Sequence, residues 1–376
     1  MNCLQTMEYI NNLINFYKLV IADNLNYKAH VIQETLKDIQ YKDIIVYPNA
    51  VHFEPCQRPQ HILREFANRG YLCLFCDYCP GEDWIIKKVG YNFYVINCEE
   101  HLLSFVQDKK VIIYMTFFIQ GIFADLCPNK IIWMDIVDRL DFFGSYNPLS
   151  REIWDKYIST ANILSYTADN LQEYLLKRKD AISLPNAVNM DDFITNCYDH
   201  EIVLEKKNKP IVGYFGAVEE WFNCDIVQYI ANTDRYEIVI IGRIGIDPKK
   251  LKHKNIILLG AVPYLQLQQH TKGFDVAIIP FKVNDLTNSV SPVKLFEYCS
   301  LGLPIVSTPI KEVAKYNSRN IKLANTSLKF LKEIDMFVNA SQDEKFKIKS
   351  AALEIAKNNE WVHRVDVIEE KIKGLR

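Results

Sequence analysis

The sequence predicts an α/β protein with two doubly wound domains, each built on a parallel sheet. Short apolar runs, rich in β-branched and aromatic residues, alternate with amphipathic stretches, and the alternation occurs twice. A polar stretch at residues 200–210 separates the two series. Strands that are apolar throughout are buried on both faces, as when helices cover both sides of a parallel sheet. A chain of 376 residues is also too long for one typical core.

The elements follow in order from the N-terminus. Residues 1–40 carry apolar side chains at helical spacing, which predicts a helical extension. The first series of strands is expected at 43–47, 71–76, 91–96, 110–115, 130–136, 162–166 and 181–184. The second series is expected at 210–216, 236–242, 255–260, 275–280 and 304–308. The tail, 342–374, is amphipathic and is expected to be helical.

Composition and motifs exclude several classes of protein. The net charge of −2 gives no electrostatic footprint for nucleic acid. No G-x-G-x-x-G follows a strand and no P-loop or G-x-S-x-G motif occurs, which argues against dinucleotide oxidoreductases, P-loop NTPases and α/β-hydrolases. The start lacks the features of a signal peptide and no apolar run reaches the ~18 residues of a membrane span. We therefore expect a cytoplasmic protein with reduced cysteines.

Three cysteines, Cys73, Cys76 and Cys79, have the spacing of part of an iron–sulfur motif. No fourth cysteine follows four residues later, and the first two lie in a strand-like run whose alternation points them to opposite faces. Buried thiols are the expectation, and no metal site is predicted.

The run 291–306 is the most informative stretch. Ser291 suits an N-cap, Pro292 a first helical position and Gly302 a C-terminal cap. Lys294 and Glu297 are three residues apart and share a helix face. Free N–H groups and a lysine suit phosphates, and a carboxylate one turn further suits the paired hydroxyls of a sugar. A nucleotide diphosphate site is one interpretation; a capped surface helix leading into a buried strand is the other.

Two aspartates, Asp135 and Asp138, end the run 130–136 at the sheet edge where ligands bind in such folds. Either carboxylate could take a proton from an acceptor hydroxyl, or it could orient the acceptor. The structural alternatives are that Asp135 caps the next segment and that Asp138 pairs with Arg139 or another cation.

Other candidates also follow strands. Arg58 and His52 lie in the loop after the first strand, where Arg58 could bind a phosphate or form a salt bridge at a helix N-terminus. Arg243 directly follows 236–242, where a guanidinium could neutralise a leaving diphosphate or lie on the surface. Gly216 permits a tight turn from strand to helix close to a donor.

Several segments resemble bacterial glycosyltransferases of the GT-B fold that are related to the GT4 group and build capsule, teichuronic-acid or O-antigen polysaccharides. In the second half the resemblance is carried by GYFGAVEEWF (213–222), NIILLGAVPYLQLQQHTKGFDVAIIPF (255–281) and NDLTNSVSPVKLFEYCSLGLPIVSTPIKEV (284–313). In the first half it is carried by QRPQHILREFANRGY (57–71), WMDIVDRLDFF (133–143) and SLPNAVNMDDF (183–193). It covers about 43–365 and leaves out 1–40.

The resemblance implies two Rossmann-like domains facing a cleft. The implied division is an extension (1–40), an acceptor-side domain (41–195), a nucleotide-sugar-binding domain (205–345) and a C-terminal helix (346–376) that packs back toward the N-terminal domain.

The resemblance also implies roles for individual residues. Glu297 matches the second glutamate of the family's paired-glutamate motif, which binds the ribose hydroxyls. Lys294, Ser291 and Thr287 would lie near the diphosphate, and Val262 and Tyr264 near the base.

The first glutamate of the pair would fall at Ser289, and a serine cannot act as a carboxylate. This departure leaves both the stereochemistry of transfer and the sugar open.

The sequence thus predicts a glycosyltransferase of hexosyltransferase type, independent of metal and without a cofactor, that moves a sugar from a nucleotide-sugar such as a UDP-sugar. The expected partners are this donor and a glycan or polyprenyl-linked acceptor, with possible peripheral contact with the inner face of the membrane and no nucleic acid. Alternatives are a catalytically silent nucleotide-sugar-binding partner of a polysaccharide assembly complex, an epimerase of the same fold and a glycan phosphorylase.

The apolar set in the extension could lie on a bilayer, but with Lys18 as the only cation before Lys28 we expect it to dock on the protein's own surface. The set comprises Leu13, Ile14, Phe16, Tyr17, Val20 and Ile21.

Overall fold

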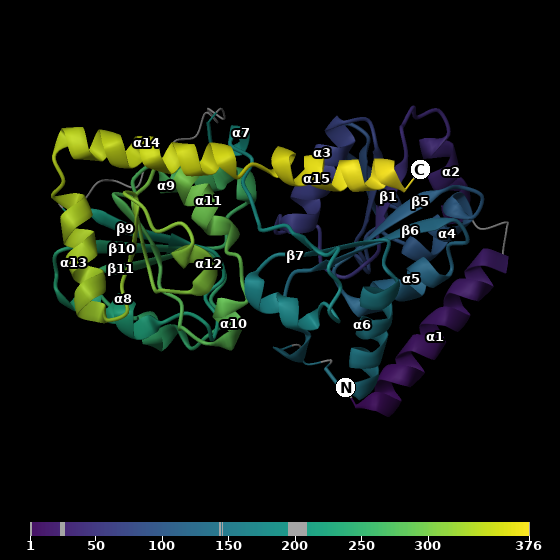
Figure 1. Ribbon diagram of the computed structural model, residues 1–376, viewed down its shortest axis with the longest axis horizontal. Helices are drawn as coiled ribbons and strands as arrows, with labels where there is room; N and C mark the ends of the chain where they lie inside the picture. The colour runs from purple at the N-terminus through teal and green to yellow at the C-terminus, as the bar shows by residue number, and fades with distance from the viewer. Residues whose placement is uncertain (1, 23–26, 143, 145, 195–208, 376) are drawn as a thin grey trace. The chain divides into compact units, whose positions relative to one another are not determined.

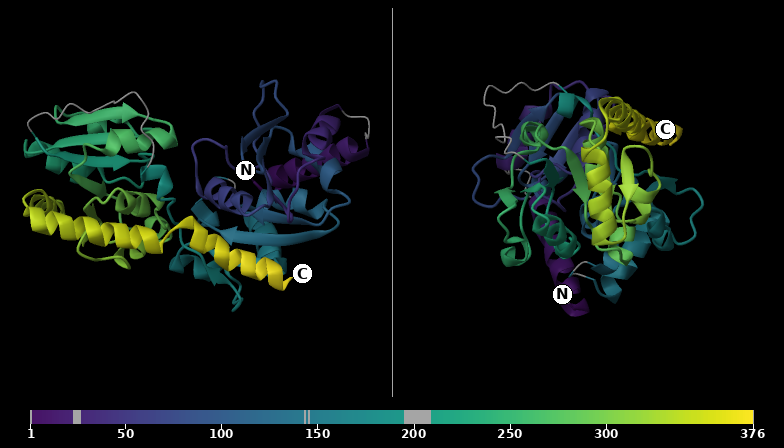
Figure 2. Two further views of the ribbon diagram at one scale, coloured as in Figure 1. Left: turned by 90° about the horizontal axis from the view of Figure 1, so that it is seen from above. Right: turned by 90° about the vertical axis from the view of Figure 1, so that its left-hand side faces the viewer.

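The computed structural model describes residues 2–22, 27–142, 144, 146–194 and 209–375. The chain divides into two compact units, Met1–Pro185 with Arg364–Arg376, and Asn186–His363 (Figure 1). Each unit contains one sheet with helices on both of its sides and one apolar core (Figure 2). The sequence predicts the boundary between about 187 and 210, and residues 195–208 of that range lie outside the described residues.

The first unit is built on an eight-stranded sheet of order β3-β4-β2-β1-β5-β6-β7-β8. All neighbours in it are parallel except β3, which runs antiparallel to β4 at the edge. Its central strands are buried along their whole length, as the apolar runs predict. The strands are β1 (Ile44–Tyr47), β2 (Leu72–Cys76), β3 (Ile86–Gly90), β4 (Phe93–Ile96), β5 (Val111–Met115), β6 (Lys130–Ile136), β7 (Ile163–Tyr166) and β8 (Ile182–Ser183).

The helices of the first unit begin where the sequence offers caps. Pro148 opens α6, and the side chain of Asn147 accepts the N–H of Ser150. The helices are α1 (Cys3–Ala22), α2 (Tyr27–Leu36), α3 (Arg58–Asn68), α4 (Glu99–Val106), α5 (Gly121–Asp125) and α6 (Pro148–Thr160), with short 3₁₀ turns η1 (Phe118–Gln120), η2 (Leu140–Phe142) and η3 (Asp169–Tyr174).

The N-terminal helix α1 packs on α4, α5 and α6 of its own unit. Tyr17 is buried and its hydroxyl donates a hydrogen bond to Glu99, which also accepts the backbone N–H of Asn49. Near the start of the helix, the Asn147 amide donates to the Thr6 hydroxyl at 2.8 Å. The expected docking on the protein's own surface is therefore found, whereas Phe16 of the predicted apolar set faces outward and is exposed.

The second unit is built on a parallel six-stranded sheet of order β11-β10-β9-β12-β13-β14. Its strands are β9 (Ile211–Phe215), β10 (Glu237–Ile241), β11 (Ile256–Gly260), β12 (Val276–Ile279), β13 (Ile305–Ser307) and β14 (Ile321–Leu323). Its helices are α7 (Asp191–Ile194), α8 (Cys224–Asn232), α9 (Leu267–Thr271), α10 (Asp285–Asn288), α11 (Val293–Ser300), α12 (Lys311–Ala314), α13 (Ser327–Val338) and α14 (Gln342–Asn358), with turns η4 (Pro248–Leu251) and η5 (Tyr264–Gln266).

The tail forms two helices where the sequence predicts a single C-terminal helix. The first, α14, packs on α11 within the second unit. The second, α15 (Trp361–Gly374), joins the first unit from residue 364 onward, where Glu369 accepts hydrogen bonds from Arg69 at 3.1 Å and Tyr71 at 3.2 Å. Within the ranges that the structure describes, no helix combines the length and apolar character needed to cross a membrane.

Candidate active site

The predicted donor residues of the second unit gather at the carboxyl edge of its sheet. Gly216 follows β9, Arg243 follows β10, and Val262 and Tyr264 follow β11. Helix α11, with Lys294 and Glu297, lies between β12 and β13. Because all these strands are parallel, their following loops emerge at one edge, which is where ligands bind in such sheets.

Helix α11 begins later than the sequence predicts. It spans Val293–Ser300 with Pro292 as the N-cap, so the prediction of Ser291 as the cap and Pro292 as the first helical residue is wrong. The reason lies in a contact remote in sequence. The Ser291 hydroxyl accepts the N–H of Asn186 at 3.2 Å, and the Ser291 carbonyl accepts the Asn186 amide. These bonds hold Ser291 outside the helix.

The predicted end of α11 is confirmed. Gly302 has a φ of +71°, which glycine adopts without strain. Its N–H donates to the carbonyl of Cys299 at 2.9 Å, and the N–H of Leu303 donates to that of Tyr298 at 3.1 Å. These two bonds form a Schellman motif, which fixes the length of the helix.

Lys294 lies in an apolar and aromatic setting. Its Nζ is 4.9 Å from the centroid of the Phe281 ring and 5.3 Å from that of Tyr214. Burial lowers the pKa of Lys294 to about 8, and the nearby Glu297 opposes this shift. Gly216, at a φ of +124°, leaves the space that Lys294 occupies. The site therefore holds a partly buried cation beside two aromatic rings.

Glu297 is 5% exposed. Burial raises its pKa to about 7, against the opposing effects of a hydrogen bond with Tyr264 and of the Lys294 charge. A carboxylate that has lost its water gains most from ligand hydroxyl groups that donate to it. The structure thus brings Glu297, Lys294, Tyr264 and Gly216 into one group.

Arg243 is held beside this group by the backbone. The Gly216 N–H donates to the Ile241 carbonyl at 2.8 Å and the Val218 N–H to the Arg243 carbonyl at 2.9 Å, so the loops after β9 and β10 run together. The Arg243 guanidinium lies 2.6 Å from the carboxylate of Glu219 and is 72% exposed. It is thus an accessible cation already partnered by one carboxylate.

Three hydroxyl groups near α11 are turned into the protein. Thr287 is 1% exposed and its hydroxyl donates to the carbonyl of Lys282 within the capping turn of α10. Ser289 is equally buried and donates to the carbonyl of Asp285 at 2.7 Å. Ser291 bonds to Asn186 as described. The diphosphate contacts of Thr287 and Ser291 stay a prediction, and Val262 packs against the core of its unit.

In the first unit, Asp135 is the centre of a buried network. Arg58 donates from Nε at 2.7 Å and from Nη2 at 3.3 Å to its two carboxylate oxygens. The hydroxyls of Tyr114 and Ser165 donate to the same carboxylate at 3.0 and 2.6 Å. Asp135 is fully buried and Arg58 is 5% exposed. The alternative of a salt bridge for Arg58 is therefore found, and Asp135 does not cap the segment that follows it.

Asp138 differs from Asp135 in its environment. It is partly exposed, and burial raises the pKa of its carboxyl group. The structural alternative, a pair with Arg139, is not found, because Arg139 binds Asp141 at 2.8 Å and Glu173 at 2.7 Å. Across the described ranges, no side chain bonds to the Asp138 carboxylate.

The structure also joins two residues that the sequence does not connect. His52, in the loop after β1, lies with Nδ1 at 2.9 Å from Oδ1 of Asp77, directly after β2. The signal was available, because both residues follow neighbouring parallel strands and so emerge at one edge. Asp77 was not predicted, because in the sequence it is a single carboxylate within the C-x-x-C-x-x-C run.

The cysteines of the C-x-x-C-x-x-C run are free thiols, with Cys73 and Cys76 buried in β2 and Cys79 partly exposed. In the parts of the chain that are described, no group of three or more His, Cys, Asp or Glu side chains has the arrangement of a metal site.

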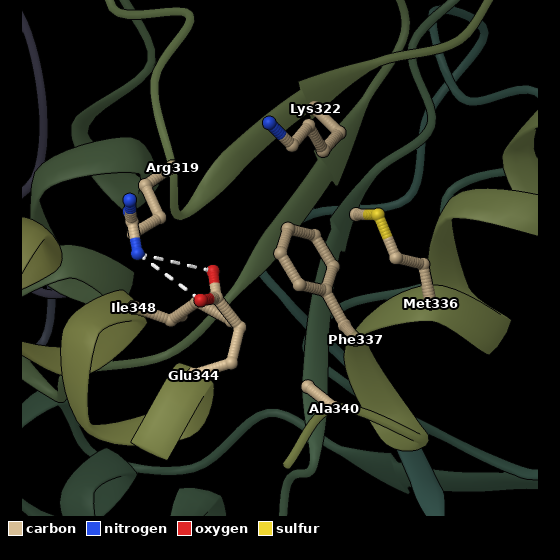
Figure 3. Close-up of a pocket in the computed structure, with 7 residues that line it drawn as sticks. All are labelled: Arg319, Lys322, Met336, Phe337, Ala340, Glu344 and Ile348. Atoms are coloured by element: carbon tan, nitrogen blue, oxygen red, sulfur yellow. Dashed lines mark hydrogen bonds and ion pairs between the residues drawn. The ribbon is translucent and has the colours of Figure 1, made fainter. Parts of the chain in front are cut away.

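A hollow of about 400 Å³ lies elsewhere in the second unit, beside the ion pair of Arg319 and Glu344 at 3.1 Å (Figure 3). It shares no residue with the groups above, and its lining comes from α13, α14 and the segment leading into and through β14. The lining residues are Arg319, Lys322, Met336, Phe337, Ala340, Glu344 and Ile348.

Known proteins share parts of this sequence and this architecture. No family model matches the chain. Over 172 residues it is 23% identical to TuaH of Bacillus subtilis (strain 168), a glycosyltransferase named for a proposed role in teichuronic acid biosynthesis, and the match spans 43% of each chain.

Solved structures match far more of the chain. Sucrose-phosphate synthase (tll1590) from Thermosynechococcus elongatus has a TM-score of 0.70 at 11% identity, covering 89% of this chain and 99% of that one. Anabaena Alr3699/HepE in complex with UDP and glucose has 0.67 at 11%, covering 89% and 100%. The E. coli trehalose-6-phosphate protein bound with UDP-2-fluoro glucose has 0.66 at 12%, covering 88% and 99%. The chain has the GT-B fold that these glycosyltransferases share.

Proposed function

We propose that this protein is a glycosyltransferase that moves a hexose-type sugar from a UDP-sugar to a polysaccharide or lipid-linked glycan acceptor. Three findings support the proposal: the GT-B fold, the structural neighbours that carry UDP or a UDP-sugar, and the partial match to a glycosyltransferase named for teichuronic acid biosynthesis. The fold alone does not define a reaction, so the residues of the site must supply the chemistry.

One observation carries the proposal. At the carboxyl edge of the second sheet, a desolvated cation and a desolvated carboxylate, Lys294 and Glu297, lie on successive turns of one helix. The cation suits a diphosphate and the carboxylate suits the two hydroxyls of a ribose. Tyr264 follows β11 and forms a hydrogen bond with Glu297, which supports it as our candidate for contact with the nucleoside.

The leaving group would be stabilised by positive charge. When the glycosidic bond breaks, charge grows on the diphosphate, and groups aimed at that charge lower the barrier. Lys294 would supply one cation and the exposed Arg243 a second, with the N-terminal N–H groups of α11 adding their dipole. We propose that these groups suffice without a metal ion.

The acceptor would be handled by the first unit. Asp138 is our candidate there, either to take the acceptor's proton or to orient the acceptor, because its carboxyl group is partly exposed and has a raised pKa. Asp135 is the second residue that the sequence suggests for this role. Its burial and its four hydrogen bonds favour a structural part.

Two measurements on one set of proteins test the function. Isothermal titration with UDP measures the binding of the nucleotide, and UDP release from a panel of UDP-hexoses measures turnover. We expect Glu297→Ala to weaken UDP binding by about 1.5–3 kcal/mol, the size of a hydrogen bond to a charged group. Glu354→Ala, an exposed glutamate on α14, is the control and should leave binding unchanged. Equal affinity in a folded Glu297→Ala protein would make the glutamate structural.

Turnover in the presence of a chelator tests the metal-free proposal. Loss of UDP release that a divalent metal restores would contradict it.

A second candidate is a catalytically silent nucleotide-sugar-binding partner of a polysaccharide assembly complex. Ser289 favours it, because this serine stands where the resemblance places a glutamate, and its hydroxyl is committed to a backbone carbonyl. UDP binding without UDP release, across all donors and with glycan acceptors added, would favour this second candidate.

A further inference from the structure

The hollow of Figure 3 lies within the second unit, beside β14, which is the last strand of its sheet. Its apolar lining comes from the end of α13 and from α14. Phe337 and Ile348 are buried there, whereas Met336 is 46% exposed. The volume of about 400 Å³ is within the range of sites that hold small molecules. The hollow therefore offers a ligand both buried apolar surface and a flexible thioether.

Two cations belong to the same lining. Nζ of Lys322 donates to the carbonyl of Ser318 at 3.1 Å, and among the described residues no carboxylate pairs with it. Arg319 meets both carboxylate oxygens of Glu344 through Nη1 alone, at 3.1 and 3.4 Å. In the described part of the chain, its Nη2 and Nε have no partner. The lining thus has two cations against one carboxylate, and both cations keep N–H groups that an anion can use.

The charged and the apolar groups share one space. Figure 3 shows the Phe337 ring and the Arg319–Glu344 pair pointing into the same hollow from different elements. A ligand with only an apolar body would leave the Lys322 ammonium without a counter-charge. A bare inorganic anion would leave the apolar lining in contact with water. A molecule that carries one anionic group on an apolar body satisfies both.

We propose that this hollow is a binding site for a small amphipathic anion. The ligand class is an aromatic or aliphatic body with one carboxylate, sulfonate or phosphate group. The anionic group accepts hydrogen bonds from Lys322 and from the remaining N–H groups of Arg319, and the body packs on Phe337 and Met336. The inference does not depend on the proposed reaction, because the lining shares no residue with the donor group around Lys294.

Titration with fluorescent probes gives the first test. Anilinonaphthalene sulfonate is an amphipathic anion whose emission rises in an apolar site, and phenylnaphthylamine has the same rings without the sulfonate. We expect Lys322→Met to weaken binding of the sulfonate about fivefold, the scale of a partly exposed ion pair, and to leave binding of the neutral probe unchanged. Lys357→Met removes an exposed lysine of α14 and is the control, which should behave as the wild type with both probes.

Glu344 provides a variant with the opposite expected sign. Its carboxylate occupies Nη1 of Arg319 and repels an anion in the hollow. Glu344→Gln should therefore tighten binding of the sulfonate by about two- to fivefold. Glu354→Gln, at an exposed position of the same helix, should leave it unchanged. A purely apolar site would respond to neither change of charge.

The titrations can contradict the inference in several ways. It is overturned if the folded wild type does not bind the sulfonate, or if Lys322→Met and Glu344→Gln bind it as the wild type does. Equal weakening in Lys357→Met and Lys322→Met overturns it too, because the attraction would then be general. Equal weakening of both probes by Lys322→Met would make the lysine structural and also overturns it.

Competition with UDP separates this site from the proposed function. Saturating UDP should leave the sulfonate bound. Displacement by UDP would place the probe at the donor group and overturn the inference, while leaving the proposed function intact. A wild type that binds the sulfonate in the hollow but binds no UDP would remove the proposed function and leave this site.

Methyl NMR of methionine locates the probe in the unaltered protein. Met336 lines the hollow, and Met7, on α1 of the other unit, has a similar exposure of 48%. The naphthalene rings should shift the methyl resonance of Met336 and leave that of Met7 in place. Met336→Leu and Met7→Leu assign the two resonances. A Met336 resonance that stays in place at saturating sulfonate, or an equal shift of both resonances, overturns the inference.

Discussion

A methyl group on Gly216 would lie 3.0 Å from Cε and 3.1 Å from Nζ of Lys294. These contacts are tighter than ordinary van der Waals distances, and the end of the lysine side chain would have to move. The φ of +124° at Gly216 is also one that an L-residue rarely adopts. The absence of a side chain at residue 216 therefore sets where the Lys294 cation lies.

We expect Gly216→Ala to weaken UDP binding and to lower the free energy of unfolding by about 1–3 kcal/mol, the usual strain of such a backbone. Gly260→Ala is a matched control, because Gly260 also has a positive φ, +74°, but has nothing within 4 Å of an added Cβ. It should lose stability and keep UDP affinity. Isothermal titration and urea denaturation measure the two quantities. Equal loss of UDP affinity in both variants would show that strain, and not Lys294, is responsible.

The raised pKa of Glu297 predicts how stability depends on pH. Its folded pKa is about 7 against an ordinary 4.5, so between these values the folded state keeps a proton that the unfolded chain has lost. The free energy of unfolding should therefore fall as the pH rises from 4.5 to 7 and level off above 7. The fall attributable to Glu297 is about 3 kcal/mol.

Glu297→Gln should remove that slope, and Glu354→Gln, at an exposed position, should keep it. Urea denaturation at a series of pH values provides the comparison. A Glu297→Gln protein with the wild-type slope would place the responsible carboxyl group elsewhere.

Lys294→Met keeps the aliphatic contact with Tyr214 and Phe281 and removes the charge. We expect turnover to fall by about 10²–10³ while the KM for the donor rises less, because charge on the diphosphate grows in the transition state. Arg243→Ala should act in the same direction. The measurement is the steady-state rate of UDP release, with Lys332→Met as an exposed control in the same unit. A rise in KM alone would mean that Lys294 binds the ground state only.

Asp135→Asn should destabilise the first unit by about 3–5 kcal/mol, because Arg58 would remain buried without its counter-charge. Asp138→Asn removes a carboxylate with no described partner and should cost far less stability. Urea denaturation of both variants makes the comparison. Similar stability in the two would mean that the buried pair contributes little.

Tyr17→Phe should lower the free energy of unfolding by about 1–3 kcal/mol, because the buried Glu99 loses a donor. Tyr9→Phe, at a half-exposed position of the same helix, is the control and should be close to neutral. Thermal or urea denaturation is the measurement. No difference between the two variants would argue against the docking of α1.

The strands could be predicted from the sequence because each is a continuous apolar run of the kind that only a twice-covered sheet accommodates. Two strands, β3 and β14, could not be predicted. β3 has two exposed lysines and lies at the edge of its sheet, and β14 is an edge strand with a lysine, Lys322, in its middle, so neither is a continuous apolar run. Gly302 could be predicted as a helix end because its requirement is local, while Ser291 could not be placed because Asn186, remote in sequence, decides its hydrogen bonds.

The candidate site could be predicted where a charged residue lies in the segment that follows a strand, as for Glu297, Lys294 and Arg243. It was not predictable where two such residues bind each other and neither is left for a ligand. Arg58 and Asp135 are 77 residues apart, and the sequence suggested each as a residue that could bind a ligand. In the fold they bind each other. His52 and Asp77 show the reverse, because neither is prominent alone and their geometry makes them a pair.

Glu99 receives a donor from each of two directions, the hydroxyl of Tyr17 in α1 and the backbone N–H of Asn49 at the start of the His52 loop. A protein shortened to begin after α1 would keep every proposed catalytic side chain. It would, however, expose the Glu99 carboxylate to water at the start of the loop after β1. Helix α1 would then hold this loop in place. We expect its removal to lower turnover as much as solubility.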